Sequence, residues 1–142
     1  MQTRTVARVF GIIYVVIGIL GFIPGILQAA PPDAPHLSLA AAYGRLLGLF
    51  PVNVLHDLVH IAVGAWGIAA AASLVRARAF FKAIAIIFAV LTILGLIGAT
   101  NTVFGLVPLY SHDIWLHALT AILGAYFGYA APAGEEARVT SR

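Results

Sequence analysis

The most prominent feature of the chain is the length of its uninterrupted apolar stretches. Runs without a charged residue cover residues 9–30, 58–75, 83–112 and 114–134. Each run is about as long as the roughly 20 residues that a helix needs to cross the hydrocarbon core of a bilayer. The pattern therefore predicts an all-α protein. Its single domain is a bundle of four transmembrane helices, at about residues 6–28, 52–75, 78–100 and 112–131.

The connection between the first two spans is patterned differently. It begins with the Pro-rich stretch APPDAPH, residues 30–36, which is typical of a loop. The following LSLAAAYGRLLGLF, residues 37–50, has an amphipathic pattern. It predicts a short helix lying at the membrane interface.

Composition and charge support a membrane protein and give its orientation. Of the 142 residues, 62% are hydrophobic and 9% are charged, too few charges for a soluble domain of this size. Seven of the eight Lys and Arg residues lie before the first run, between the second and third, or after the fourth, and Arg45 is the exception. Cytoplasmic loops are enriched in Lys and Arg, so both termini are expected in the cytoplasm. The small net charge of +3 makes the lipid bilayer, and not nucleic acid, the expected partner.

An internal repeat aligns two parts of the chain without a gap. GLFPVNVLHDLVH, residues 48–60, matches GLVPLYSHDIWLH, residues 105–117, at four positions, which are one glycine, one leucine, one proline and one histidine. ILGFIPG, residues 19–25, also resembles ILGLIGA, residues 93–99. The chain is therefore predicted to consist of two tandem helix pairs that cross the membrane in the same sense.

The repeat places residues that can bind metal at equivalent positions. His56 and His60 are four residues apart in one repeat, and Asp113 and His117 have the same spacing in the other. Residues four apart lie on one face of a helix, so each repeat offers a pair of ligands at one depth in the outer leaflet. These four residues are the predicted metal ligands.

Three interpretations of this cluster stay open. Imidazole and carboxylate without sulfur suit a divalent transition metal such as zinc or copper. Haem could bind between His60 and His117, across the bundle. Alternatively, the histidines only form hydrogen bonds that hold the helices together. The protein would then be a non-catalytic accessory or structural subunit of a larger membrane complex.

Three further polar residues are candidates for a supporting role near this site. Asp57 is rotated by about 100° from His56 on a helix, and it could pair with Arg45 on the predicted interfacial helix. His112 lies at the expected membrane edge, where it could contact the ligands or simply be solvated.

The quoted motifs carry a resemblance to a known family. The segments GLFPVNVLHDLVH and GLVP followed by DIWLH resemble a bacterial family of small four-helix membrane proteins that is catalogued as a domain of unknown function. The resemblance covers about residues 8–131 and implies a four-helix topology and location in the bacterial inner membrane. It implies the histidine pattern at His56, His60 and His117, but no activity.

Motifs of known enzymes are absent from the sequence. There is no GxSxG, Walker loop, GxGxxG or HExxH, so the chain is not expected to be an enzyme. It also has no cysteine, which excludes disulfides and thiolate metal sites. A membrane-protein partner or a second copy of the chain is compatible with the sequence, which names neither.

Overall fold

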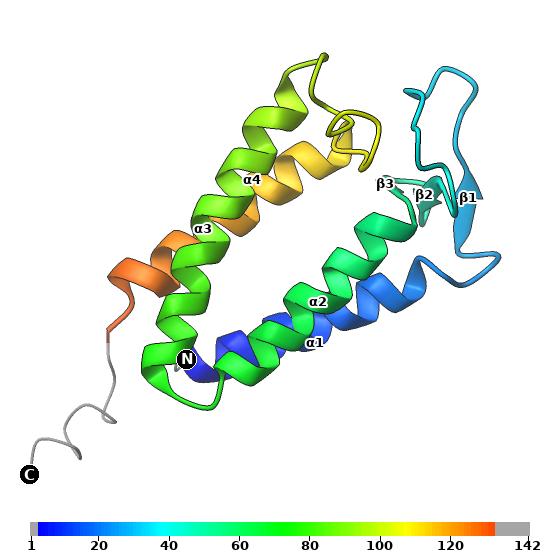
Figure 1. The fold of residues 1–142 in the computed structure, drawn as a ribbon. Coiled ribbons are helices and arrows are strands. Elements are labelled where there is room, and N and C mark those ends of the chain that lie inside the picture. Colours follow the sequence, from blue (N-terminus) through cyan, green and yellow to red (C-terminus); the bar gives the residue numbers. More distant parts are fainter. Residues whose placement is uncertain (1–2, 133–142) are drawn as a thin grey trace, which may run out of the picture.

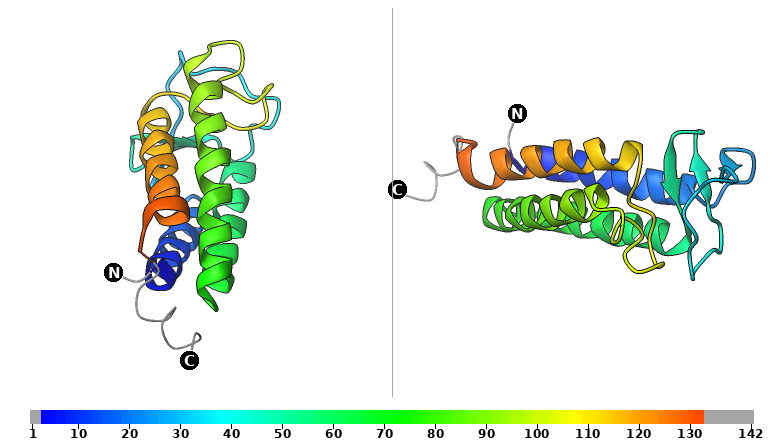
Figure 2. Two further views of the ribbon diagram at one scale, coloured as in Figure 1. Left: turned by 90° about the vertical axis from the view of Figure 1, so that its left-hand side faces the viewer. Right: turned by 90° about the horizontal axis from the view of Figure 1, so that it is seen from above.

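Helices arranged in two antiparallel pairs make up most of the computed structural model, which describes residues 3–132 (Figure 1). They are α1 (Thr3–Leu20), α2 (Val54–Ala70), α3 (Leu74–Leu96) and α4 (His112–Ala125), and α4 continues into the π-helical turn η1 (Tyr126–Ala130). α1 packs along α2, and α3 packs along α4. Seen from above, α1 and α4 lie in one layer and α2 and α3 in the other (Figure 2). Each of the four long helices predicted from the apolar runs therefore corresponds to an observed helix.

The first helix is shorter than predicted. α1 ends at Leu20, whereas the apolar run continues to residue 30. The chain turns after Leu20, and Gly25 has a φ of 94°, a left-handed conformation that glycine adopts without a steric penalty. Pro24 lies in the same turn, and its ring removes a backbone N–H that a continuing helix would use.

A small antiparallel sheet joins α1 to α2 at the end of the bundle opposite Thr3 (Figure 1). Its strands, in the order β1-β2-β3, are β1 (Leu27–Ala29), β2 (Gly44–Leu46) and β3 (Phe50–Val52). The prediction of an interfacial helix at residues 37–50 was therefore wrong. The fold is mostly helical with one small sheet, and not all-α.

Local backbone geometry explains why residues 37–50 do not form a helix. Ala42, Leu47 and Gly48 have φ angles of 53°, 55° and 75°, which break any helical run. Gly44 packs so tightly on β1 that an added Cβ would overlap the carbonyl oxygen of Gln28. Of the leucines that suggested a helical face, Leu46 lies on β2 and is buried, whereas Leu47 and Leu49 lie outside the strands and are exposed.

Close contacts at glycines bring the helix backbones together within each of the two helix pairs. In the first pair, a Cβ at Gly67 of α2 would lie 3.2 Å from the Cα of Gly11 in α1. In the second pair, a Cβ at Gly124 of α4 would lie 3.0 Å from the Cα of Ala85 in α3. Gly124 aligns with Gly67, and Ala85 aligns with Gly11 under the repeat found in the sequence. The same pairs of positions therefore bring the helix backbones together twice.

The core of the bundle is aromatic and lies toward the end that holds Thr3. Phe80, Phe81 and Phe88 of α3 are buried there with Tyr14 of α1. Phe10 packs edge-on against Phe80 and Phe81, with ring centroids 5.7 and 6.0 Å away. These contacts join the two helix pairs at this end. Toward the sheet, the pairs leave space for polar groups and two cavities.

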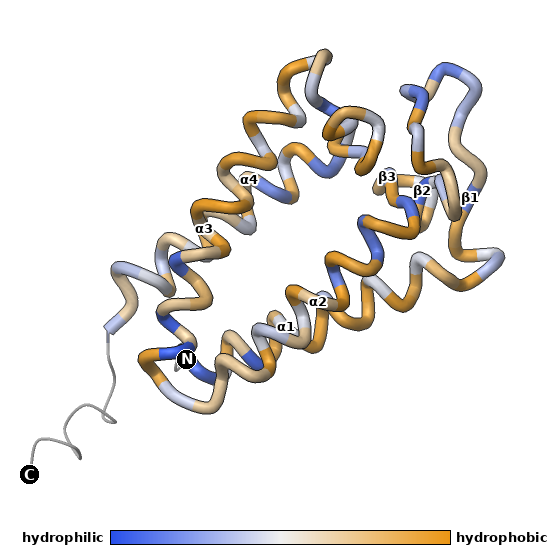
Figure 3. The backbone as a smooth tube through the Cα atoms, viewed as in Figure 1, coloured by the Kyte–Doolittle hydropathy of each residue, from blue (hydrophilic) through white to orange (hydrophobic). Residues whose placement is uncertain are grey.

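The helices consist mostly of hydrophobic residues (Figure 3), and many of their large apolar side chains are exposed. Large side chains are exposed there, including Ile12 (49%), Ile93 (57%) and Ile122 (66%). So many exposed large apolar side chains on a chain of this size favour contact with lipid or with another protein. Among the described helices, α1 and α3 are long and apolar enough to cross a membrane, and α2 is apolar but shorter, at 17 residues.

Candidate metal centre

The first turn of α2 is fixed by Asn53, which connects three parts of the chain. Its side-chain oxygen accepts a hydrogen bond from the backbone N–H of His56 (2.9 Å) and so caps the helix. Its Nδ2 donates to the carbonyl oxygens of Leu39 (2.8 Å) and Leu106 (2.7 Å). The loop before β2 and the loop before α4 are thus both tied to the start of α2, the helix that carries His56.

The loops on either side of this cap are also joined. Tyr43 and Tyr110 share a hydrogen bond between their hydroxyl groups (2.7 Å), and the Tyr43 hydroxyl donates to the carbonyl oxygen of Pro35 (3.0 Å). Burial raises the pKa of Tyr43, which keeps its hydroxyl protonated and able to donate. The N-terminal ends of α2 and α4 are therefore held in a fixed register.

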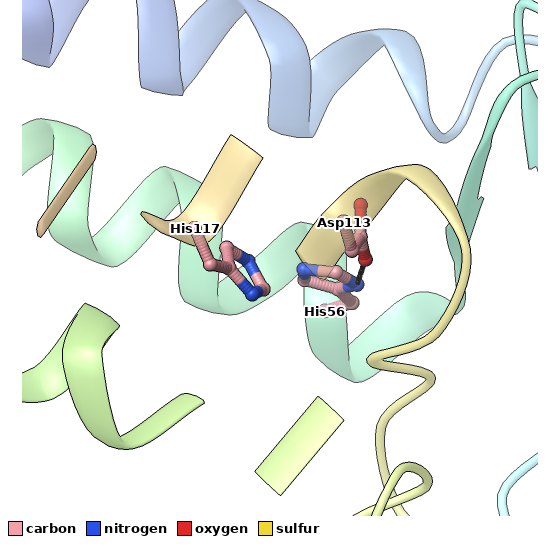
Figure 4. A group of neighbouring side chains, drawn as sticks. All are labelled: His56, Asp113 and His117. Atoms are coloured by element: carbon pink, nitrogen blue, oxygen red, sulfur yellow. Dashed lines mark ion pairs between the residues drawn. The ribbon is translucent and has the colours of Figure 1, made fainter. Parts of the chain in front are cut away.

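This register brings His56, Asp113 and His117 together (Figure 4). One ligand atom from each lies within 4.8 Å of those of the other two. The closest approach to the carboxylate is from Nδ1 of His56 to Oδ2 of Asp113, at 3.8 Å. All three side chains are buried, with 3–4% of their surface exposed. The two helix pairs thus each contribute to one polar cluster, as the repeat predicted.

His60 lies beside this group but outside the 4.8 Å set. Its ring stacks on that of His56, with centroids 4.5 Å apart and planes inclined by 28°. His56, not His60, makes the ring contact with His117, at 6.1 Å between centroids. The contact between the two helix pairs is therefore made by His56, one helical turn nearer the sheet than a direct contact between His60 and His117 would be.

Several polar atoms in the cluster lack a hydrogen-bond partner among the described residues. They are Nδ1 of His56, His60 and His117, and Oδ2 of Asp113. Nearly all buried polar groups in proteins have a partner, and an exception calls for a bound water or ion. Three of these residues, His56, Asp113 and His117, bring ligand atoms within 4.8 Å of one another, and His60 stacks beside them. This arrangement fits a cation that accepts nitrogen and oxygen ligands.

The geometry fits a metal ion after a small contraction. At metal–ligand bonds of about 2.0–2.2 Å, tetrahedral ligand atoms lie roughly 3.4 Å apart. The 3.8 Å separation of His56 and Asp113 is already close to that value. The widest pair has to approach by roughly 1–1.5 Å, which side-chain rotation can supply.

The other residues predicted near the site do not support the ligands in the expected way. Asp57 is fully buried, but both of its carboxylate oxygens lack a hydrogen-bond partner in the described part of the chain. The expected ion pair with Arg45 is therefore not formed, because Arg45 lies on β2 and not on an interfacial helix. His112 is exposed, and its Nδ1 lies 3.1 Å from Oγ of its neighbour Ser111.

Aromatic and hydroxyl side chains that the sequence did not single out surround the cluster. Tyr14 contacts the edge of His60 (5.3 Å between centroids), and Phe88 contacts that of His117 (5.2 Å). The Tyr14 hydroxyl also hydrogen-bonds Thr120 Oγ1 (3.2 Å), joining α1 to α4 next to the site. The sequence gave no sign of the contact between Tyr14 and Thr120, because the two residues are 106 positions apart in the chain.

One family matches nearly the whole described chain. Residues 4–130 match the model of the domain of unknown function DUF4383. The chain belongs to this family. No curated protein and no solved structure matches it. The resemblance expected from the two motif segments is thus confirmed as an uncharacterised family, and the function has to be argued from the site.

Proposed function

We propose that this DUF4383 protein is a four-span inner-membrane protein that binds a divalent transition metal ion in the outer leaflet. His56, Asp113 and His117 are the central ligands, and His60 supplies a fourth. The observation that carries the proposal is the convergence of His56, Asp113 and His117 from the two repeats, at a place where buried nitrogen and oxygen atoms lack a hydrogen-bond partner among the described residues. The proposed role is binding and not catalysis.

The membrane location is supported by the apolar outer faces of the helices. α2 is about 25 Å long at 1.5 Å per residue, close to the roughly 30 Å hydrocarbon thickness. α4 and η1 run on without a break from His112 to Ala130, which gives a similar length. The start of α1 and the basic first part of α3 lie at the same end of the bundle (Figure 1), as expected for the cytoplasmic side.

Zinc and copper are the ions that this ligand set favours. Neutral imidazoles and one carboxylate match both, and the missing thiolates exclude sulfur-dominated sites. Haem fits less well than a single ion. Its macrocycle would have to lie between imidazoles, whereas His56 already stacks on His60 and approaches His117.

The direct test is elemental analysis of protein purified without a histidine tag. We expect about one zinc or copper ion per chain, and loss of that ion in His56→Ala and in His117→Ala. His112→Ala is the matched control, since it removes an exposed histidine from the first turn of α4, the helix that also carries His117. Metal well below one per chain after reconstitution would favour the alternative, an accessory subunit whose histidines only stabilise the bundle.

A further inference from the structure

A cavity of about 340 Å³ lies between α1 and α4, next to the candidate metal centre. His60, Asp113 and His117 form part of its lining. The rest is almost entirely apolar and comes from α1, α4 and the sheet region, including Ile13, Ile17, Leu119 and Leu123. The cavity therefore joins metal ligands to hydrocarbon-like walls.

The outer part of this cavity faces the bilayer in the proposed membrane location. Ile13 is 50% exposed and Leu119 is 46% exposed, although both line the cavity. A ligand with an apolar chain could therefore enter from the lipid without crossing a polar surface. Ligand pockets in proteins start at roughly 300 Å³. This one can hold a polar head and the first part of one chain, with the remaining chain in the lipid.

The charge of the occupied site indicates which head group is favoured. A divalent ion bound by neutral histidines and Asp113 leaves one uncompensated positive charge in a buried, apolar region, which is costly. Asp57 does not compensate it as a ligand, since it belongs neither to the 4.8 Å group nor to the cavity lining. A ligand with a single negative charge would neutralise the site.

We propose that the cavity binds a long-chain carboxylic acid whose carboxylate reaches the metal as a fifth ligand, beside the four protein ligands. The inference rests on the proposed metal site and names the ligand class for it. The carboxylate lies at the His60, Asp113 and His117 end, and the chain runs between α1 and α4. Binding of the acid and of the metal then favour each other.

Linkage between the two ligands tests this directly. The affinity for Zn²⁺ is measured by chelator competition in nanodiscs of neutral lipid, with laurate, with 1-dodecanol, or with neither. Laurate should tighten Zn²⁺ binding at least about fivefold, within the usual range of coupling between sites, and Zn²⁺ should tighten laurate binding by the same factor. Dodecanol has the same chain without the charge and should have no such effect.

Variants of the cavity wall separate this proposal from the metal site itself. Ile17→Trp, on α1, which carries no metal ligand, should abolish the laurate effect and leave the Zn²⁺ affinity without laurate unchanged. Leu123→Trp, from the opposite wall, is a second variant if the first fails to fold. Ile86→Trp, at a 60% exposed position on α3 outside the cavity lining, should retain the laurate effect.

The outcomes distinguish the two proposals. Normal Zn²⁺ binding that laurate does not tighten would overturn the carboxylate proposal and leave the metal site standing. Equal tightening by laurate and dodecanol would also overturn it, because the charge would then play no part. Absence of Zn²⁺ binding in every arm would overturn the metal site and this inference together.

Discussion

Gly21 lies directly against the side chain of Asp57. An added Cβ at Gly21 would overlap the carboxyl carbon and both carboxylate oxygens. The second pair repeats the contact, because a Cβ at Gly95 would lie 3.2 Å from Cγ1 of Ile114, the residue that aligns with Asp57. Asp57 therefore occupies the position of an apolar packing residue, and its carboxylate is covered by the backbone just after the end of α1.

Replacing Gly21 by alanine should destabilise the protein by about 1–3 kcal/mol, the usual cost of overpacking a filled site. The added methyl group has to displace the Asp57 carboxylate from a fully buried position. The free energy of unfolding in mild detergent is the measurement. Gly98→Ala is the control, since nothing lies within 4 Å of its Cβ position and its stability should stay within about 0.5 kcal/mol of the parent. Equal effects at both positions would contradict the packing argument.

The two buried aspartates should respond differently to the same isosteric change. Asp113→Asn removes the only carboxylate of the ligand group and should weaken Zn²⁺ binding by at least about a hundredfold, the upper range seen for residues that only support a ligand. Asp57→Asn should leave the Zn²⁺ affinity within a factor of about three. It should also stabilise the fold by about 1 kcal/mol or more, because a buried carboxylate without a partner is replaced by a neutral amide.

Chelator competition with both variants checks this prediction. A comparable loss of affinity in Asp57→Asn and Asp113→Asn would place Asp57 among the ligands. The assignment of the site to His56, Asp113 and His117 would then be incomplete.

Asn53→Ala should destabilise the protein by about 2–4 kcal/mol. It removes the cap of α2, worth roughly 1 kcal/mol, and leaves the carbonyl groups of Leu39 and Leu106 without their side-chain donor. Ser73→Ala is the matched control, because Ser73 caps α3 through one hydrogen bond at an exposed position and should cost about 1 kcal/mol. Thermal unfolding of the two variants measures the difference. A smaller effect at Asn53 than at Ser73 would contradict the bridging role.

Orientation can be tested cleanly because the chain has no cysteine. A cysteine at Asp33, in the exposed loop beside the sheet, should react with an impermeant thiol reagent added to spheroplasts. A cysteine at Arg76, exposed in the first turn of α3, should react only after lysis. The reverse pattern would place the metal centre on the cytoplasmic side.

The sequence predicted the helices and the pairing of the repeats because these depend on local pattern. His56 and Asp113 meet because Pro51 and Pro108 precede equivalent helices, and the aligned motifs predicted this register. The position of His60 relative to His117 could not be predicted from the aligned motifs, since it depends on how the two helix pairs pack against each other. Its stacking on His56 places it beside the group and not across from His117.

The sheet could not be read from the sequence for a different reason. Each strand has three residues, and β2 is held by long-range contacts such as that of Gly44 with Gln28. A run such as LSLAAAYGRLLGLF has apolar spacing that a helix could also use, and the choice is made by partners elsewhere in the chain. The hydrogen bonds of Asn53 to two separate loops belong to the same class of non-local contact.

The tandem arrangement of two similar helix pairs bears on the symmetry of the site. Two identical chains meeting about a twofold axis must present the same residues to each other, so each ligand type would appear in even number. Here the position of His56 in one pair is occupied by Asp113 in the other. Joining the pairs in one polypeptide allows their equivalent positions to differ. The cluster can therefore combine three imidazoles with a single carboxylate, a composition that a symmetric dimer of one pair could not achieve.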